Sequence, residues 1–141
     1  MSTPTDRGTI STSTALKTGL GAGVVAAILN VIVSVVARGP FDASDDFVPL
    51  TPGPIVFWTI VGAVVGAIGW RLIVNKKADS RGLLNKLVPT VLVLSLIPDV
   101  ALLGNDSMEG HSTGAVVALM VMHVLTAAVV VTAYRKAMPP R

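Results

Sequence analysis

Four long apolar segments dominate the chain, and short polar stretches separate them. Three of the segments contain uncharged runs of 20, 24 and 23 residues, at 18–37, 47–70 and 112–134. About 20 predominantly apolar residues in a helix span the roughly 30 Å of hydrocarbon in a bilayer. The pattern predicts an all-α membrane protein, an antiparallel bundle of four transmembrane helices. The expected helices cover residues 16–37, 54–74, 83–103 and 113–136.

The composition points to the same class. Hydrophobic residues make up 52% of the chain and charged residues only 13%, whereas a soluble domain averages about 25% charged residues. The chain contains no cysteine, which excludes disulfides, thiolate metal ligands and thiol catalysis. No phosphate-binding loop is present, and no cofactor is expected.

The third apolar segment is irregular, because it carries two prolines and an acid. A proline inside a helix removes one backbone donor, so Pro89 and Pro98 predict a broken helix, with the carbonyl oxygen of Leu94 free in the bundle. Broken helices are tolerated at membrane depth where they line protein or a cavity. Asp99 follows Pro98 directly, and an ionisable residue within a membrane is by default a functional candidate.

Small residues recur at helical spacing in the first two segments. In the first segment they share one face, formed by Gly19, Gly23, Ala26, Asn30 and Ser34. In the second segment a similar stripe consists of Trp58, Gly62, Gly66 and Gly69. Small residues let helix backbones approach closely, so the two stripes predict a tight hairpin. Trp70 is expected at the membrane interface, where tryptophan is enriched.

The charged residues predict an orientation. Ten of the 11 basic residues lie in or beside the two ends of the chain and the middle loop, and six of the eight acidic residues lie near the other two loops. The positive-inside rule therefore predicts a multi-pass plasma-membrane protein with both termini in the cytoplasm. Residues 1–15 are expected to form a disordered tail and residues 137–141 a short one. The excess of basic over acidic residues then reflects the orientation of the protein in the membrane, and no nucleic-acid partner is expected.

The apolar segments also contain polar side chains, which lie about four to ten residues below the ends of their segments. The candidates for one polar pocket, open toward the outside, are Asp99, His123, Asn30, Ser95 and Thr59. Asp99 would supply a counter-charge and His123 a titrating partner for a cation, a proton or a small polar-headed ligand. The alternative is structural: Asp99 caps a kink or reaches the outer interface, and His123 holds the bundle through a hydrogen bond to Asn30 or Ser95.

The loop at residues 104–111 contains acid, thioether and imidazole groups. Asp106, Glu109 and His111 are candidate metal ligands on the basis of their chemistry. Their spacing matches no defined ligand pattern, and such residues are common in solvated loops. No hydroxyl nucleophile stands beside an evident base, so no catalytic residue is assigned.

The pairs Pro98-Asp99 and Met122-His123 carry a resemblance to a known group of proteins. The chain resembles the small four-span membrane proteins of unknown function found in actinobacteria, over about residues 15–136. The resemblance implies the four-helix topology and draws attention to Asp99 and His123. It implies no activity.

Three functions fit this sequence. The first is binding or transport of a small cationic or polar-headed lipophilic molecule, coupled to protons through Asp99 and His123. The second is a structural or accessory subunit, in a homo-oligomer or a larger membrane complex. The third is a membrane enzyme with Asp99 and His123 as an acid–base pair, which we rank last. The length matches that of small multidrug transporters, but their first-span acid is replaced here by Asn30.

Overall fold

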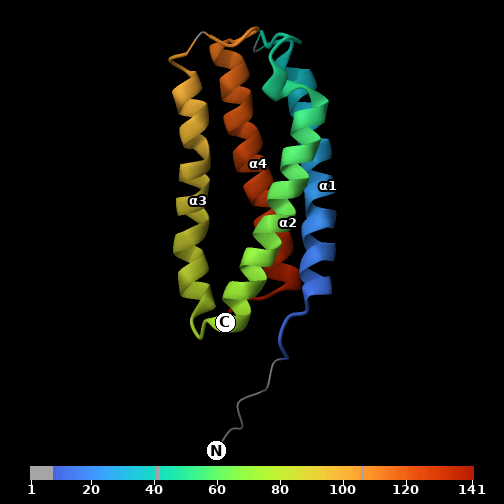
Figure 1. Cartoon of the computed structure of the whole chain (residues 1–141), viewed down its shortest axis with the longest axis vertical. Helices are drawn as coiled ribbons and strands as arrows, with labels where there is room; N and C mark the ends of the chain where they lie inside the picture. Colours follow the sequence, from blue (N-terminus) through green and yellow to red (C-terminus); the bar gives the residue numbers. More distant parts are fainter. Residues whose placement is uncertain (1–7, 41, 106) are drawn as a thin grey trace, which may run out of the picture.

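The computed structural model describes residues 8–40, 42–105 and 107–141 and, within them, contains four long helices and no strand. The helices are α1 (Thr12–Ala37), α2 (Pro52–Lys76), α3 (Ser80–Leu102) and α4 (Thr113–Ala137), with a short 3-10 turn, η1 (Val48–Leu50), before α2. Successive helices run in opposite directions along the long axis (Figure 1). All four are long and apolar enough to cross a membrane. The predicted all-α architecture is confirmed, and it suggests a multi-pass membrane protein.

The first helix begins earlier than the sequence predicted. Helix α1 starts at Thr12, where the Ser11 side chain accepts a hydrogen bond from the Thr14 amide. The backbone of Ile10 is also fixed, because Asn75 on α2 donates to its carbonyl at 2.9 Å and accepts from its amide at 2.9 Å. Arg71 donates to the same carbonyl. The predicted tail at 1–15 is therefore wrong from Ile10 onward, and its residues 1–7 lie outside the described ranges.

The tight contact between α1 and α2 is confirmed, but only one of the two predicted glycine stripes makes it. Gly19 and Gly23 pack on the alanine face of α2, where Cβ atoms built on them would lie 2.8 Å and 3.0 Å from the Cβ atoms of Ala67 and Ala63. Cβ atoms at Gly62 and Gly69 would meet no atom within 4 Å. The predicted packing role of the α2 glycine stripe is wrong, because that stripe faces away from α1.

Aromatic residues close the bundle at the end where α1 starts. Trp70 is buried rather than at an interface, and its indole N–H donates to the carbonyl of Met138 at 2.9 Å. The Tyr134 hydroxyl donates to the carbonyl of Ala63, which joins α4 to α2. The segment after α4 is held as well, since the Arg141 amide donates to the Ser80 hydroxyl at 2.8 Å. The predicted short tail is thus packed against the α2–α3 turn.

Helix α3 is the least buried of the four and packs mainly on α4. It continues through Pro89 and Pro98 without a break, contrary to the broken helix expected. Pro98 and Leu94 are exposed, and neither lines the cleft described below. The prolines therefore do not supply free carbonyl groups to the cleft.

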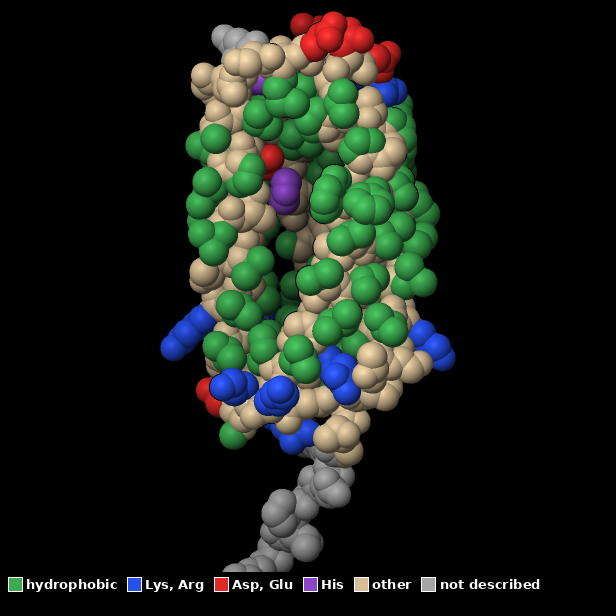
Figure 2. All heavy atoms as spheres, viewed as in Figure 1, with side chains coloured by type: hydrophobic (Ala, Val, Ile, Leu, Met, Phe, Trp, Pro, Cys, Tyr) green, Lys and Arg blue, Asp and Glu red, His purple; other side chains and the backbone are tan. Residues whose placement is uncertain are grey.

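The two ends of the bundle carry opposite charge. Acidic side chains gather at the top of the molecule in Figure 2, and basic side chains gather at the bottom, beside the α2–α3 turn. Arg38 is the basic residue of the acidic end, where its guanidinium lies 2.7 Å from the carboxylate of Asp45. The face between the two ends that Figure 2 shows is largely apolar, as a bilayer requires.

Candidate functional site: a lateral cleft with a polar cluster

A cleft of about 820 Å³ lies between α2 and α3, with α4 as its floor. It extends from Val48 and Pro49 near the acidic end to Trp70 and Ile73 near the basic end. Figure 2 shows this face hollowed between two apolar walls, with a histidine and an acidic side chain inside the hollow. The opening lies along the apolar side of the bundle and not at either end.

The glycines of α2 explain why the cleft is open. Gly62, Gly66 and Gly69 line it, and they place no side chain between α2 and α3. A Cβ atom at Gly66 would lie 3.1 Å from the hydroxyl oxygen of Tyr134, near the basic end of the cleft. The glycine stripe of α2, which was expected to pack against another helix, therefore forms one wall of the cleft.

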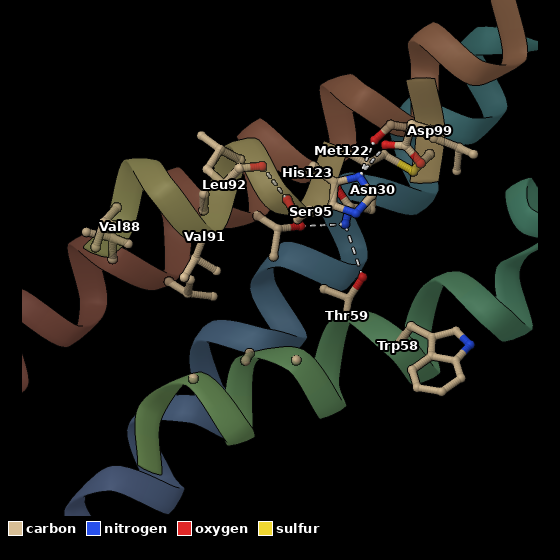
Figure 3. A pocket seen from close by; sticks show the side chains of 18 of the residues that line it. Asn30, Trp58, Thr59, Val88, Val91, Leu92, Ser95, Asp99, Met122 and His123 are labelled. Atoms are coloured by element: carbon tan, nitrogen blue, oxygen red, sulfur yellow. Dashed lines mark hydrogen bonds and ion pairs between the residues drawn. The ribbon is translucent and has the colours of Figure 1, made fainter. Parts of the chain in front are cut away.

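Asp99 and His123 meet in the acidic half of the cleft. The Asp99 Oδ2 atom lies 3.0 Å from His123 Nδ1, and Figure 3 shows the carboxylate pointing toward the ring. The Asp99 side chain is only 7% exposed, whereas that of His123 is 38% exposed. The pair therefore places a buried acid behind a histidine that is open to the cleft.

The contact also fixes how the two helices are staggered. Asp99 is the fourth residue from the end of α3, whereas His123 is the eleventh residue of α4. Helix α4 must therefore extend about 10 Å beyond the end of α3, at 1.5 Å per residue. The residues after α3 bridge this difference in height before α4 begins.

The backbone sets the tautomer of His123. Its Nδ1 lies 2.9 Å from the carbonyl oxygen of Leu119, one turn earlier on α4. A carbonyl oxygen can only accept, so Nδ1 carries the proton in this hydrogen bond. In a neutral ring Nε2 then holds the lone pair, and no hydrogen bond from the described residues reaches it. The nitrogen that is free to meet a ligand is therefore Nε2.

Three helices are tied together just beside this pair. The Asn30 side chain on α1 donates to the hydroxyl of Thr59 on α2 at 3.1 Å and to the hydroxyl of Thr126 on α4 at 2.8 Å (Figure 3). All three residues line the cleft together with Asp99 and His123. We call these five residues the polar cluster. Thr126 was not among the predicted site residues, although its position three residues after His123 places it on the same face of α4.

The remaining predicted site residue, Ser95, also lines the cleft. Its hydroxyl donates to the carbonyl of Leu92 at 2.7 Å, so it is satisfied within α3. The structural alternative in which His123 bonds to Asn30 or Ser95 does not occur among the described residues. The five predicted pocket residues thus line one cleft, and Asp99 is the partner of His123.

Two oxygen atoms of the polar cluster lack a hydrogen-bond donor. Asn30 is 2% exposed and Asp99 is 5% exposed. Within the described residues, Asn30 Oδ1 and Asp99 Oδ2 accept no hydrogen bond. The N–H of His123 is directed to Leu119, so it lies beside the carboxylate instead of pointing at it. Buried acceptors of this kind are costly and are rare in native proteins.

The candidate metal ligands of the loop at residues 104–111 do not assemble in the part of the chain that the structure describes. Asp106 lies outside it, and Glu109 is exposed. His111 Nε2 lies 2.7 Å from the carbonyl of Leu102, at the end of α3, and its ring contacts Phe47 edge-on at 6.2 Å. No group of three or more His, Asp or Glu side chains with metal-binding geometry occurs there.

The fold and the cleft define a class: a four-helix protein of membrane-spanning character, with a polar cluster inside an apolar lateral cleft. The chain belongs to DUF6069, a family of unknown function whose match covers residues 10–139. No curated protein and no solved structure shows a significant match to the chain.

Proposed function

We propose that this protein is embedded in the plasma membrane and binds a lipophilic molecule with a polar head group. The molecule enters the cleft sideways from the bilayer, with its head at the polar cluster and its chain between α2 and α3. The observation that carries the proposal is the 820 Å³ cleft, because its lining is apolar except around the polar cluster. Ligand sites typically combine a large apolar lining with a few convergent polar groups.

The orientation belongs to the same proposal. The basic end of the bundle faces the cytoplasm and the acidic end faces outward, as the positive-inside rule favours. The polar cluster then lies in the outer half of the membrane. This placement supports capture of a ligand from the outer leaflet as the first step of binding or transport.

A purely structural role for the polar cluster accounts less well for its chemistry. A packing role favours polar groups that satisfy one another, as the Asn30 NH2 group does with the hydroxyls of Thr59 and Thr126. Asn30 Oδ1 and Asp99 Oδ2 instead lack a donor among the described residues, and Asp99 lies behind a histidine that is open to the cleft. These features favour a ligand over a role in packing alone.

One observation favours an enzyme as a second candidate. His123 presents a free Nε2 to the cleft while an acid lies beside its Nδ1, and this arrangement suits proton transfer to or from a bound molecule. Binding and catalysis are separated by mass spectrometry of the recovered ligand. Binding returns it unchanged, whereas catalysis returns a changed mass.

The proposal is tested with amphiphiles that carry a terminal bromine, which quenches tryptophan fluorescence on contact. Trp70 is a better reporter than the exposed Trp58, because Trp70 is buried and lines the part of the cleft near the basic end. The full chain with Trp58→Phe, which keeps Trp70 as its single tryptophan, is placed in phosphatidylcholine nanodiscs. Brominated dodecylammonium, dodecanol and dodecyl sulfate are titrated separately. We expect at least one probe to quench Trp70 in a saturable manner.

Gly62→Leu is the blocking variant, and Gly21→Leu is its control. Neither glycine has an atom within 4 Å of an added Cβ, so both variants should fold. Only Gly62 lines the cleft, and its leucine side chain occupies the space of the ligand. We expect binding to weaken about tenfold or more in Gly62→Leu and to stay unchanged in Gly21→Leu. Failure of all three probes to bind, or equal binding to both variants, would contradict the proposed function.

A further inference from the structure

The polar cluster indicates which kind of head group the cleft accepts. Asn30 Oδ1 and Asp99 Oδ2 are acceptors without donors among the described residues, and the neutral His123 ring adds the lone pair of Nε2. All three acceptors belong to residues that line the same cleft, so a complementary head group is one that donates hydrogen bonds. An anionic head group lacks such donors and would also be repelled by the Asp99 carboxylate.

Charge distinguishes an ammonium head from a neutral hydroxyl. The titratable side chains that line the cleft are Asp99 from α3 and His123 and Tyr134 from α4, with none from α1 or α2 among the described residues. Tyr134 is at the other end of the cleft, where it donates to Ala63. With His123 neutral, the polar cluster therefore carries the negative charge of Asp99, which an ammonium group neutralises. Hydrogen bonds to charged groups are also stronger than neutral ones.

The rest of the cleft fits a single long chain. Thr59 marks the level of the polar cluster on α2, and Trp70 lies 11 residues further along the same helix. This separation corresponds to about 17 Å at 1.5 Å per residue. The wall between them carries Gly62, Gly66 and Gly69, and the facing wall of α3 carries apolar residues such as Leu87 and Val91. The chain would therefore run from the polar cluster toward the basic end.

We infer that the cleft binds a long-chain amphiphile with an ammonium head, and that this head competes with a proton on His123 for the Asp99 carboxylate. The inference rests on the proposed function and names its ligand class. A protonated His123 forms an ion pair with Asp99, which lies 3.0 Å away. The ion pair removes both the negative charge and the Nε2 lone pair, so the ammonium head loses its site. Ammonium binding thus releases the proton of His123.

The first test compares head groups with the brominated probes, in the Trp58→Phe chain in phosphatidylcholine nanodiscs. An alkylammonium, like a lysine side chain, stays charged from pH 5 to pH 8. We expect dodecylammonium to bind more tightly than dodecanol at pH 8, and dodecyl sulfate to bind least. Asp99→Asn should weaken the binding of dodecylammonium about 10- to 100-fold and leave the affinity for dodecanol nearly unchanged. A bromine at the chain end should quench Trp70, and one beside the head should not.

The second test measures how dodecylammonium binding depends on pH and whether it releases a proton. Dodecylammonium affinity should fall on the order of tenfold from pH 8 to pH 5, because a proton on Nε2 of His123 removes the lone pair that accepts from the head group. At the acidic end of this range, binding should release up to about one proton per ligand into a weakly buffered solution. His123→Gln keeps an amide donor for Asp99 but cannot titrate, so its dodecylammonium affinity should be the same at both pH values. The proton count uses the native side chains and does not depend on the folding of any cluster variant.

The outcomes separate the two proposals. If dodecanol or dodecyl sulfate binds as tightly as dodecylammonium and Gly62→Leu still blocks it, the ligand class is wrong while the cleft remains a binding site. If dodecylammonium binds with no pH dependence and no proton release, the competition with His123 is wrong. If no probe binds in a saturable manner, the proposed function is lost as well.

Discussion

Replacing Gly19 with leucine is expected to separate α1 from α2 and to leave little folded protein in detergent. Even a Cβ atom at this position would lie 2.9 Å from the carbonyl oxygen of Ala63 and 2.9 Å from the Cα atom of Val64. These are backbone atoms of α2, so no side-chain rotation relieves the clash. Inserting a larger group into a packed contact costs about 1–3 kcal/mol and sometimes more. We expect a loss of about 3 kcal/mol or more, because a whole helix must move.

Gly21 supplies the control for this experiment on the same helix. It is exposed, and a Cβ atom there would meet nothing within 4 Å. Gly21→Leu changes the composition of α1 by the same amount and should unfold at the wild-type temperature. Thermal unfolding in detergent, followed by circular dichroism, measures both variants. Equal unfolding temperatures for Gly19→Leu and Gly21→Leu would show that the close helix contact is not needed for the fold.

The single variant His123→Leu should be less stable than the double variant in which Asp99→Asn also removes the charge of the carboxylate. His123→Leu leaves a carboxylate that is 7% exposed beside an apolar side chain. A buried charged group that loses its polar neighbour costs about 1–3 kcal/mol or more. Because His123 is partly open to the cleft, we expect about 2 kcal/mol. The double variant Asp99→Asn with His123→Leu contains no unpaired charge and should recover most of this loss.

The same unfolding measurement on the four proteins of this cycle gives the interaction energy between the two side chains. The Asp99→Asn single variant should stay close to wild type in stability, because an amide can still face the ring. Additive effects of the two substitutions would indicate that the acid and the imidazole do not interact, and the cleft would then lack the charged pair on which the proton competition depends.

The site was predictable from the sequence in its main residues but not in its contacts. Asp99 and His123 stand out because ionisable side chains are rare in apolar segments. The sequence predicted them in one pocket, but only the structure shows that they touch, because the contact requires α4 to extend past the end of α3. Thr126 was not among the predicted site residues, and only the hydrogen bond from Asn30 distinguishes it.

The prolines and glycines have structural roles that the sequence alone did not predict. Pro98 suggested a broken helix, but α3 is continuous and exposes this residue. The two glycine stripes look alike in the sequence, yet Gly19 and Gly23 lie against a helix while Gly62 and Gly69 border open space. A small residue allows a close approach, but it does not require that a neighbour fill the space.

The sequence by itself determined the helices, their number and the opposite charges of the two ends, because hydropathy and loop charge act locally along the chain. The tertiary structure decided which faces meet, how far α4 extends past α3, and which nitrogen of His123 faces the cleft. Between helices in a membrane there is little hydrophobic force to select a face, since lipid chains are as apolar as leucine. Close packing and hydrogen bonds such as those of Asn30 make that choice, and they exist only once the helices are assembled.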